Sequence, residues 1–384
     1  MSKHTLALTT YIKRNCKHTW LVVALFNVNA PFYFLLMSDM NGLRRILSIL
    51  LGLLMLCAHM HAADEFTVLQ WNVWQEGTSV KGGYEAIVNE IVRLKPDFVT
   101  LSEVRNYHNT NFTRRLTDAL RQRGETYYSF YTYDTGLLSR YPITDSLTVF
   151  PCKDDHGSIY RLLCTARGYR FAVYTAHLDY LNDTYYEVRG YDGNSWREMS
   201  SLTDIAEILR RNALSKREEA IRLFLAQAAK DEAQGYHIIL GGDFNEPSML
   251  DWTERTRYLY DHHGVVLAWP VSRLLAEAGF TDVYRAIYPN ELTHPGFTFP
   301  ADNPAVPPSR LSWTPLADER DRIDFVYVKG KGLRVMDAAL FGPSGGIAYG
   351  RRVANPTRCE RFILPLSTWP TDHKGVWVKL RVEK

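Results

Sequence analysis

Carboxylate, amide and imidazole side chains stand at or near the ends of apolar runs along this chain, and such groups bind cations and activate water. Each alone could cap a turn or be a structural histidine. A buried carboxylate without a partner costs on the order of several kcal/mol, so a shared cleft that holds a cation explains the whole set economically. Oxygen ligands and His without Cys suit Mg²⁺, or Mn²⁺ or Ca²⁺, better than structural Zn²⁺. The set comprises Asn72, Glu103, His177, Asp243, Asn245, Asp324, Asp372 and His373.

The elements that must position these residues alternate between strand and helix patterns after residue 64. We expect the strands between 126 and 177 to form an antiparallel meander, and Ser215 to open a helix with a capping box. Strands and helices are mixed without a linker or repeat, which favours one α+β domain over 64–384. Helices are predicted at 84–94, 112–123 and 215–235, and strands at 66–73, 98–101, 126–133, 136–139, 143–151, 159–167, 170–177, 237–240, 322–329, 332–340 and 376–382.

The ordered motifs resemble the endonuclease/exonuclease/phosphatase (deoxyribonuclease-I-like) superfamily over residues 66–382. The most specific motifs are Gly-Asp-Phe-Asn at 242–245 and Asp-His at 372–373, and the segment 136–143 adds support. The resemblance implies a four-layer α/β-β/α sandwich, in which two mixed β-sheets pack face to face with helices outside.

The resemblance also implies a role for each residue of the set. Glu103 corresponds to the principal metal ligand, Asn72 to its neighbour in the metal shell, and Asp372 to the residue that completes the metal site. Asp243 corresponds to the residue that aligns and deprotonates the attacking water, and Asn245 to the amide that holds water and phosphate. His373, oriented by Asp324, corresponds to the histidine that contacts the phosphate, and His177 to the one on the leaving-group side. The predicted protein is an exported, Mg²⁺-dependent phosphodiesterase or phosphatase; an extracellular nuclease and a catalytically silent binding domain are the alternatives.

The substrate is less well defined by the residues. Trp74 and His177 stand where the abasic-site endonuclease branch has Asp and Tyr, which disfavours a DNA-repair role. The aromatic segment 180–214 is expected to wall the cleft or to be a loop packed on itself. The His262-His263 pair and the proline-rich run 295–315 are expected at the surface. The candidate substrate-binding residues are Tyr185, Arg189, Tyr191 and Arg217.

Residues 1–63 are expected to be a leader rather than part of the fold. Over 40–63, two arginines precede an apolar run of about a dozen residues, and small residues follow, as in a signal peptide. A signal anchor is the alternative, although the run is short for a membrane span. We expect translation to start at Met37 or Met40, so that 1–39 is a start-site artefact. The mature protein is then periplasmic or secreted, without a stable membrane span.

Composition and charge exclude other classes of protein. A chain of 384 residues that is 46% apolar and 23% charged is neither disordered nor a small disulfide scaffold. The net charge is +3, but 1–63 hold six of the 45 basic residues and one of the 42 acidic residues. Residues 64–384 therefore carry 39 basic and 41 acidic side chains, a net charge of −2. This balance disfavours a nucleic-acid partner, and we expect a monomer.

Overall fold

The computed structural model describes residues 7–15, 18–26, 34–37, 65–151 and 156–383. The chain divides into two units, Met1–Asp64 and Glu65–Lys384. In the first unit, β1 (Ala7–Asn15), β2 (His18–Phe26) and β3 (Phe34–Met37) form an antiparallel sheet in that order. The predicted signal peptide over 40–63 lies outside the described residues. No helix in the described ranges is long and apolar enough to cross a bilayer.

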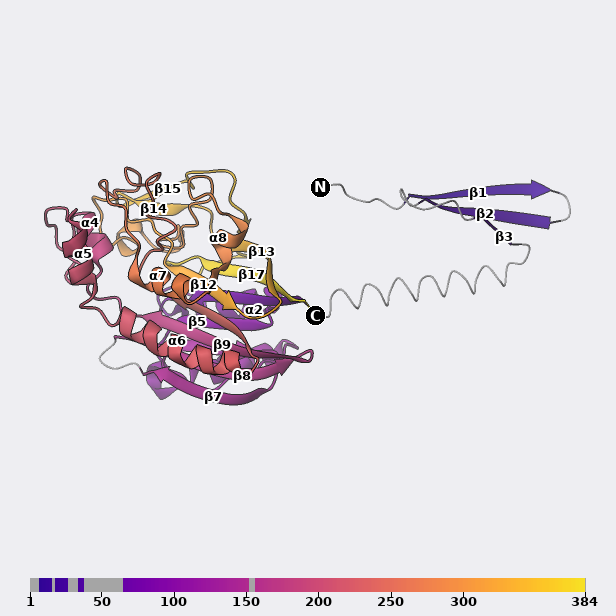
Figure 1. The fold of residues 1–384 in the computed structure, drawn as a ribbon, viewed down its shortest axis with the longest axis horizontal. Helices are drawn as coiled ribbons and strands as arrows, with labels where there is room; N and C mark the ends of the chain where they lie inside the picture. The colour runs from indigo at the N-terminus through magenta and orange to yellow at the C-terminus, as the bar shows by residue number, and fades with distance from the viewer. Residues whose placement is uncertain (1–6, 16–17, 27–33, 38–64, 152–155, 384) are drawn as a thin grey trace. The chain divides into compact units, whose positions relative to one another are not determined.

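Two six-stranded mixed sheets build the second unit (Figure 1). The first runs β16 (Phe362–Ile363), β13 (Leu333–Phe341), β17 (Gly375–Val382), β4 (Glu65–Asn72), β5 (Phe98–Val104), β6 (Asp134–Ser139). The second runs β11 (Thr281–Asp282), β12 (Asp324–Lys329), β10 (His237–Asp243), β9 (Tyr169–Leu178), β8 (Gly157–Ala166), β7 (Ile143–Phe150). The central pairs β4–β5 and β9–β10 are parallel. A separate hairpin joins β14 (Gly346–Ala348) to β15 (Arg351–Val353).

Helices cover the outer face of each sheet, so the unit has four layers. The helices α2 (Gly83–Leu94) and α3 (Phe112–Gln122) pack on the first sheet, and α6 (Arg217–Ala233) and α7 (Pro270–Glu277) pack on the second. A third apolar cluster fills the space between the two sheets. This is the α/β-β/α sandwich expected from the sequence. The shorter helices are η1 (Gln75–Gly77), η2 (Tyr107–Asn109), α4 (Thr184–Val188), α5 (Ile205–Asn212), α8 (Val283–Ile287) and η3 (Pro308–Arg310).

Successive side chains of a strand point to opposite faces of the sheet, so a strand that is apolar on both faces can pack between two apolar layers. In β4, Phe66 and Val68 pack into the cluster between the sheets, whereas Leu69 and Trp71 pack against the helices. Continuing this alternation puts residue 72 on the face toward the other sheet. The same count puts residues 177 of β9 and 243 of β10 on the inner face, because Val173 and Ile239 belong to the inner cluster. The inner face of each strand therefore changes from apolar to polar at its carboxyl end.

A glycine allows the sheets to approach closely beside these polar ends. A Cβ atom on Gly241 of β10 would lie 2.2 Å from Oγ1 of Thr100, which belongs to β5 of the facing sheet. That hydroxyl is already committed, because it donates to Oε1 of Gln70 at 2.6 Å. Only glycine fits at position 241 without a shift of this buried contact.

Several local expectations are wrong. The segment 126–133 is not a strand and only bridges to β6 through Tyr128. The meander is limited to β7, β8 and β9, because β6 pairs with β5 in the other sheet. Helix α6 has Lys216 at its N-cap and no side-chain cap, so the capping box at Ser215 is not formed.

Two segments expected at the surface are buried in part. Within 295–315, Phe297, Phe299 and Leu311 are at most 5% exposed. His262 is also buried, and its ring stacks on Trp252 with 3.8 Å between centroids. His263 and Trp313 are exposed, so the expectation of a surface position is wrong for part of each segment and correct for the rest.

The aromatic segment 180–214 is a folded wall. Its helices α4 and α5 pack through Tyr185 and Ile208 against Trp252 and Trp269, which follow β10 in the chain. The segment is thus neither a free loop nor packed only on itself, and its position beside the ends of β9 and β10 bears on the polar cluster there.

Candidate active site

Three of the predicted residues lie side by side on neighbouring strands. Asp243 at the end of β10 pairs in register with Asp324 on the antiparallel strand β12 and with His177 on the parallel strand β9. In-register residues on adjacent strands point to the same side of a sheet, which here is the side facing the first sheet. From that sheet, Asn72 at the end of β4 donates through Nδ2 to Oδ2 of Asp243 at 2.9 Å.

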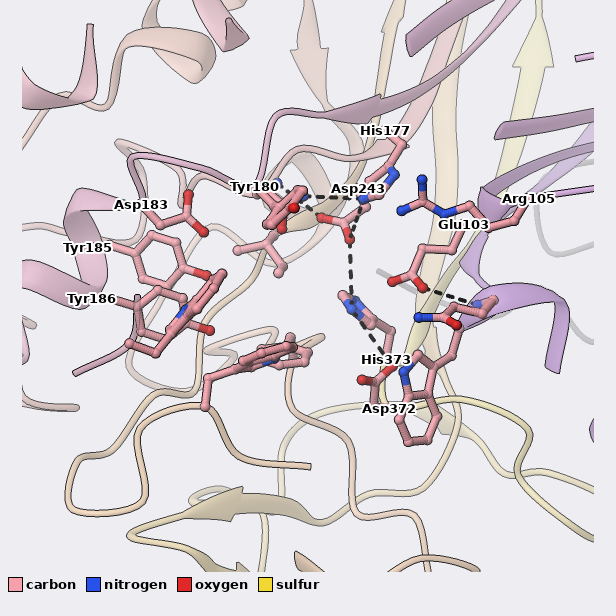
Figure 2. A pocket seen from close by; sticks show the side chains of 17 residues that line it. Glu103, Arg105, His177, Tyr180, Asp183, Tyr185, Tyr186, Asp243, Asp372 and His373 are labelled. Atoms are coloured by element: carbon pink, nitrogen blue, oxygen red, sulfur yellow. Dashed lines mark hydrogen bonds and ion pairs between the residues drawn. The ribbon is translucent and has the colours of Figure 1, made fainter. Parts of the chain in front are cut away.

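Each of the two histidines is held by a carboxylate through Nδ1. His373, just before β17, lies 2.8 Å from Oδ2 of Asp324, and His177 lies 2.9 Å from Oδ2 of Asp134. The opposite ring nitrogens face the same carboxylate: Nε2 of His373 is 3.7 Å and Nε2 of His177 is 4.0 Å from Oδ2 of Asp243. Figure 2 shows Asp243 between the two rings. One carboxylate thus lies between two imidazoles, each with its own acidic partner.

The electrostatic environment keeps both rings protonated. Burial alone lowers the pKa of an imidazole, but the charges of Asp134 and Asp243 outweigh it and raise the pKa of His177 to about 9. In the same way, Asp324 and Asp243 raise the pKa of His373 to about 10 against the effect of burial. Burial, with the nearby charge of Asp324, raises the pKa of Asp243 to about 6. The centre therefore combines two cationic rings with a carboxylate more basic than usual.

Glu103 reaches the cluster from a bulge. The β5–β6 register shifts between Ser102 and Val104, and the intervening Glu103 has a positive φ of 63°. Such a backbone is unfavourable for a non-glycine residue and occurs where a side chain is re-aimed. The carboxylate of Glu103 accepts from Nδ2 of Asn72 at 3.0 Å and from the backbone N–H of Gln75 at 3.0 Å. Asn245 also has a positive φ, 46°, and its amide donates to the carbonyl of Leu178 at 2.9 Å.

The carboxylates of Glu103 and Asp372 fit a hard divalent cation, because Mg²⁺, Mn²⁺ and Ca²⁺ prefer oxygen ligands. Asn72 presents Nδ2 to Glu103, while its Oδ1 accepts from the backbone N–H of Trp74 at 2.9 Å, so its amide would have to turn to bind a cation. The pKa of the Asp372 carboxyl is raised to about 7, first by burial and also by the charge of Glu103, although His373 opposes the shift. A bound cation would relieve the repulsion between carboxylates that lie close together without enough positive charge nearby.

Asp243, Asp324 and His373 form a second cluster whose ligand atoms lie within 4.8 Å of one another. Asp324 and His373 already bond to each other at 2.8 Å, so a cation there would have to displace that bond. The side of Glu103 remains the predicted cation site.

The comparison with known proteins agrees with this geometry. Residues 69–373 match the sequence profile of the Endonuclease/Exonuclease/phosphatase family. The chain belongs to this family. The matched range contains all eight residues of the predicted set, and the members of the family are hydrolases that act on phosphoester bonds.

Individual relatives of this endonuclease/exonuclease/phosphatase chain are distant. It is 28% identical over 264 residues to uncharacterized protein F14F9.5 of Caenorhabditis elegans, a match that covers 68% of this chain and 78% of that protein. It is similar to the structure of D. rerio TDP2 complexed with single strand DNA product, with 16% identity, a TM-score of 0.46 and coverage of 83% and 99%. For the human nocturnin catalytic domain with bound sulfate, the values are 13%, 0.46, 83% and 95%.

A cavity of about 270 Å³ is lined by most of the predicted catalytic and metal-binding residues. Its lining includes most of the predicted set and Tyr185, while Asn72 and Asp324 stand behind it as partners of lining residues. In Figure 2, Tyr180, Asp183, Tyr185 and Tyr186 lie on one side of Asp243, and Glu103 and Arg105 lie on the other. The predicted residues in the lining are Glu103, His177, Tyr185, Asp243, Asn245, Asp372 and His373.

Three predicted substrate-binding residues are not part of this lining. Arg189 is buried and pairs with Asp321 at 2.7 Å, and Arg217 is buried and pairs with Asp183 at 2.5 Å. The hydroxyl of Tyr191 accepts from the backbone N–H of Leu316 at 3.0 Å. These side chains anchor the 180–214 segment instead of facing the cavity, so the expectation that they contact substrate is corrected to a structural role.

Sequence reasoning also missed functional neighbours. Asp134 is buried beside His177 and forms an ion pair with Arg105 at 3.0 Å, and Arg105 lines the cavity. Asp134 comes immediately before the family segment 136–143 and Arg105 comes two residues after Glu103. A search for charged residues next to the recognised motifs would have found both.

Proposed function

We propose that this protein is a divalent-metal-dependent hydrolase of phosphoester bonds, with Mg²⁺ as its cation. The observation that carries the proposal is the placement of Asp243 between two imidazoles that are each paired with a carboxylate. Hydrolysis of a phosphoester requires an aligned water molecule, positive charge at the phosphate and a proton for the leaving oxygen. The described side chains offer a group for each requirement.

Asp243 is the base in this proposal. Its pKa of about 6 makes it a better proton acceptor than an ordinary carboxylate while it is still ionised at neutral pH. Asn245 follows it in the same turn, and its backbone N–H donates to Oδ1 of Asp243 at 3.0 Å. That bond fixes Oδ1. Oδ2, which lies between the rings, accepts from Nδ2 of Asn72 and has a second lone pair with which to orient water.

The two imidazolium rings bind the phosphate and serve the leaving oxygen. His373, fixed by Asp324, is protonated below about pH 10 and can donate through Nε2 to a phosphate oxygen. His177, fixed by Asp134, can donate a proton on the leaving-group side. A divalent cation held by Glu103, Asn72 and Asp372 would supply charge neutralisation at a non-bridging phosphate oxygen.

Hydrolysis of bis-p-nitrophenyl phosphate tests the activity. We expect turnover that EDTA abolishes and Mg²⁺ restores, with Mn²⁺ and Ca²⁺ as comparison cations. Asp243→Asn and His373→Ala are expected to lower kcat by roughly 10²- to 10⁴-fold with unchanged circular dichroism. The matched control is Asp337→Asn, which removes a partly exposed carboxylate of β13 that pairs with Arg361.

Turnover that persists in EDTA would contradict the metal requirement, and full activity in Asp243→Asn would contradict the role of this carboxylate. No turnover on any phosphoester, with phosphate still bound, would favour a catalytically silent binding domain.

We propose a small phosphoester as the substrate rather than a long polymer. A cavity of about 270 Å³ is at the low end for ligand sites, and the chain from 64 to 384 has a net charge of −2. An extracellular nuclease is the second candidate. Degradation of plasmid DNA, measured beside hydrolysis of sphingomyelin and of sugar phosphates, separates the two.

Export is the remaining part of the proposal. The basic, apolar and small-residue succession over 40–63 supports a cleaved signal peptide. N-terminal sequencing of the native protein is expected to start near Asp64. Recovery of a residue before Met37 would contradict the proposed start site.

A further inference from the structure

Three aromatic rings line the proposed catalytic cavity next to one another. The rings of Tyr180 and Trp196 are parallel, with 6.2 Å between centroids and 5° between planes. The rings of Trp196 and Trp313 lie 4.8 Å apart at 37°. All three side chains belong to the lining of the cavity, and Tyr180 lies on the far side of Asp243 from Glu103 in Figure 2. The row therefore begins beside the proposed nucleophile site, away from the cation side.

Trp313 exposes an unusual amount of apolar ring. It is 52% exposed, whereas Trp71, Trp252, Trp269 and Trp369 are at most 1% exposed. Burying a tryptophan ring is strongly favourable, so a ring that stays exposed at the mouth of a cavity is available for a ligand.

Hydrogen bonds to a buried carboxylate hold the loop that carries Trp313. The buried carboxylate of Glu319 accepts from the backbone N–H of Trp313 at 3.0 Å, from that of Thr314 at 3.3 Å and from the hydroxyl of Ser312 at 2.5 Å. A ring on such a fixed loop loses little conformational entropy when a ligand binds to it.

Trp196 is equally constrained. The backbone of Trp196 has a positive φ of 52°, which is rare for a bulky residue. Its backbone N–H donates to the backbone carbonyl of Asp192 at 2.8 Å. The side chain of Asp192 in turn accepts from the backbone N–H groups of Asn194 and Ser195. The turn thus presents the indole toward Trp313 before any ligand arrives.

We propose that Tyr180, Trp196 and Trp313 form a platform on which a planar aromatic ring of the substrate stacks while its phosphoester group lies at Asp243. The inference rests on the proposed phosphoester hydrolase and deepens it by naming the substrate class: small phosphoesters that carry a flat ring, as a nucleotide or an aryl phosphate does. Among the described lining residues Ile323 is the only aliphatic one, which disfavours a lipid chain as the occupant.

Binding measurements test the platform independently of turnover. The full chain with Mg²⁺ and the Asp243→Asn substitution, which is expected to slow hydrolysis, is titrated calorimetrically with adenosine monophosphate and with ribose 5-phosphate. Stacking of one base predicts a roughly 5- to 150-fold tighter Kd for the ligand with the ring. In Trp313→Ala and Trp196→Ala this ratio is expected to fall toward one, and Trp313→Phe is expected to retain most of it.

The control is Tyr258→Ala, which removes a ring that is 75% exposed and lies outside the cavity lining; the ratio should not change. Phenyl phosphate measured against methyl phosphate shows whether a phenyl ring is accepted as well as a nucleobase. A ratio near one in the parent chain, or a ratio unchanged in Trp313→Ala, would overturn the platform. Equal weakening of both ligands in Trp313→Ala would also overturn it, because the platform would then bind the sugar.

The two hypotheses fail separately. Hydrolysis of bis-p-nitrophenyl phosphate by the unsubstituted chain reports on the proposed function, and the Kd ratio reports on the platform alone. A ring preference that depends on Trp313 in a chain without turnover would keep the platform and reject the hydrolase.

Discussion

At the residue scale, a carboxylate partner decides the charge of each buried histidine. Burial without such a partner lowers the pKa of His237, and it lowers the pKa of His262 well below its ordinary value. His177 and His373 are also buried, but Asp134 and Asp324 bond to them and their pKa values rise to about 9 and about 10. The same side chain is therefore apolar packing in one place and a cation in another.

Asp134→Asn isolates this effect without removing the imidazole. The amide keeps the shape of the side chain but not its charge, so burial should lower the pKa of His177 from about 9. Because the proposed role of His177 needs its proton, activity should be lost at a lower pH than in the unsubstituted chain. The decrease is roughly tenfold for each unit by which the pKa falls below the assay pH. The measurement is kcat/KM for bis-p-nitrophenyl phosphate between pH 5 and pH 10.

The control for this substitution is Asp145→Asn, whose carboxylate is 58% exposed and pairs with Arg161 outside the cavity lining. Its pH profile should match that of the unsubstituted chain. A uniform loss of activity in Asp134→Asn, with the alkaline limb unmoved, would show that Asp134 does not act through the charge of His177.

How far single residues could be predicted depended on their place in a strand. Asn72, His177 and Asp243 were recognisable because each interrupts the end of an apolar strand. Asp134 begins strand β6, where a polar residue is ordinary, and its contact with His177 spans 43 positions in sequence. Arg189 was predicted to bind substrate, but it is buried against Asp321. That burial depends on tertiary packing, which no local sequence pattern encodes.

At the element scale, the polar ends of several strands meet because the two sheets pack face to face. The parallel neighbours β9 and β10 bring His177 and Asp243 into register, and the antiparallel β12 adds Asp324. Alternation within each strand was readable from the sequence, and most strands and all three predicted helices are present. The assignment of β6 to the other sheet was not readable, because pairing partners depend on long-range contacts.

Gly241→Ala tests how tightly the sheets must fit beside the site. The added Cβ would lie 2.2 Å from Oγ1 of Thr100, whose bond to Gln70 also supports Asp324 through Nε2 at 3.4 Å. We expect a loss of about 1–3 kcal/mol in the free energy of unfolding, together with a lower kcat, because the sheet carrying Asp243 must shift. Urea denaturation and steady-state kinetics measure the two effects.

The matched substitution is Gly136→Ala, also at a strand glycine. Its Cβ would meet side-chain atoms of Leu101 and Val104 at 3.2 Å, and these can move by a few tenths of an ångström. Gly136→Ala should therefore be the milder of the two. An equal or larger loss in Gly136→Ala would indicate that the distance between the sheets at Thr100 is not the critical constraint.

At the scale of the whole molecule, the distribution of charge separates a small substrate from a polymer. The positive net charge of the chain comes from 1–63, and residues 64–384 carry −2. Within the described lining of the cavity, the positive side chains are Arg105, His177 and His373, and the acidic ones are Glu103, Asp183, Asp243 and Asp372. This lining offers positive charge for one phosphate group and none beyond it along a strand of nucleic acid.

The dependence of KM on salt concentration follows from this arrangement. A protein that neutralises 6–10 phosphates loses roughly 10³- to 10⁵-fold in affinity between 50 and 200 mM salt, whereas contact with one phosphate gives a logarithmic slope of about −1. We therefore expect KM for bis-p-nitrophenyl phosphate to rise no more than about fourfold over that range. A chain that begins at Asp64 should show the same slope, since it keeps every residue of the lining. A steep slope with plasmid DNA in that shorter chain would contradict the small-substrate proposal and favour the nuclease. A steep slope confined to the full chain would instead assign the DNA contact to the basic residues of 1–63, because they are what the shorter chain lacks.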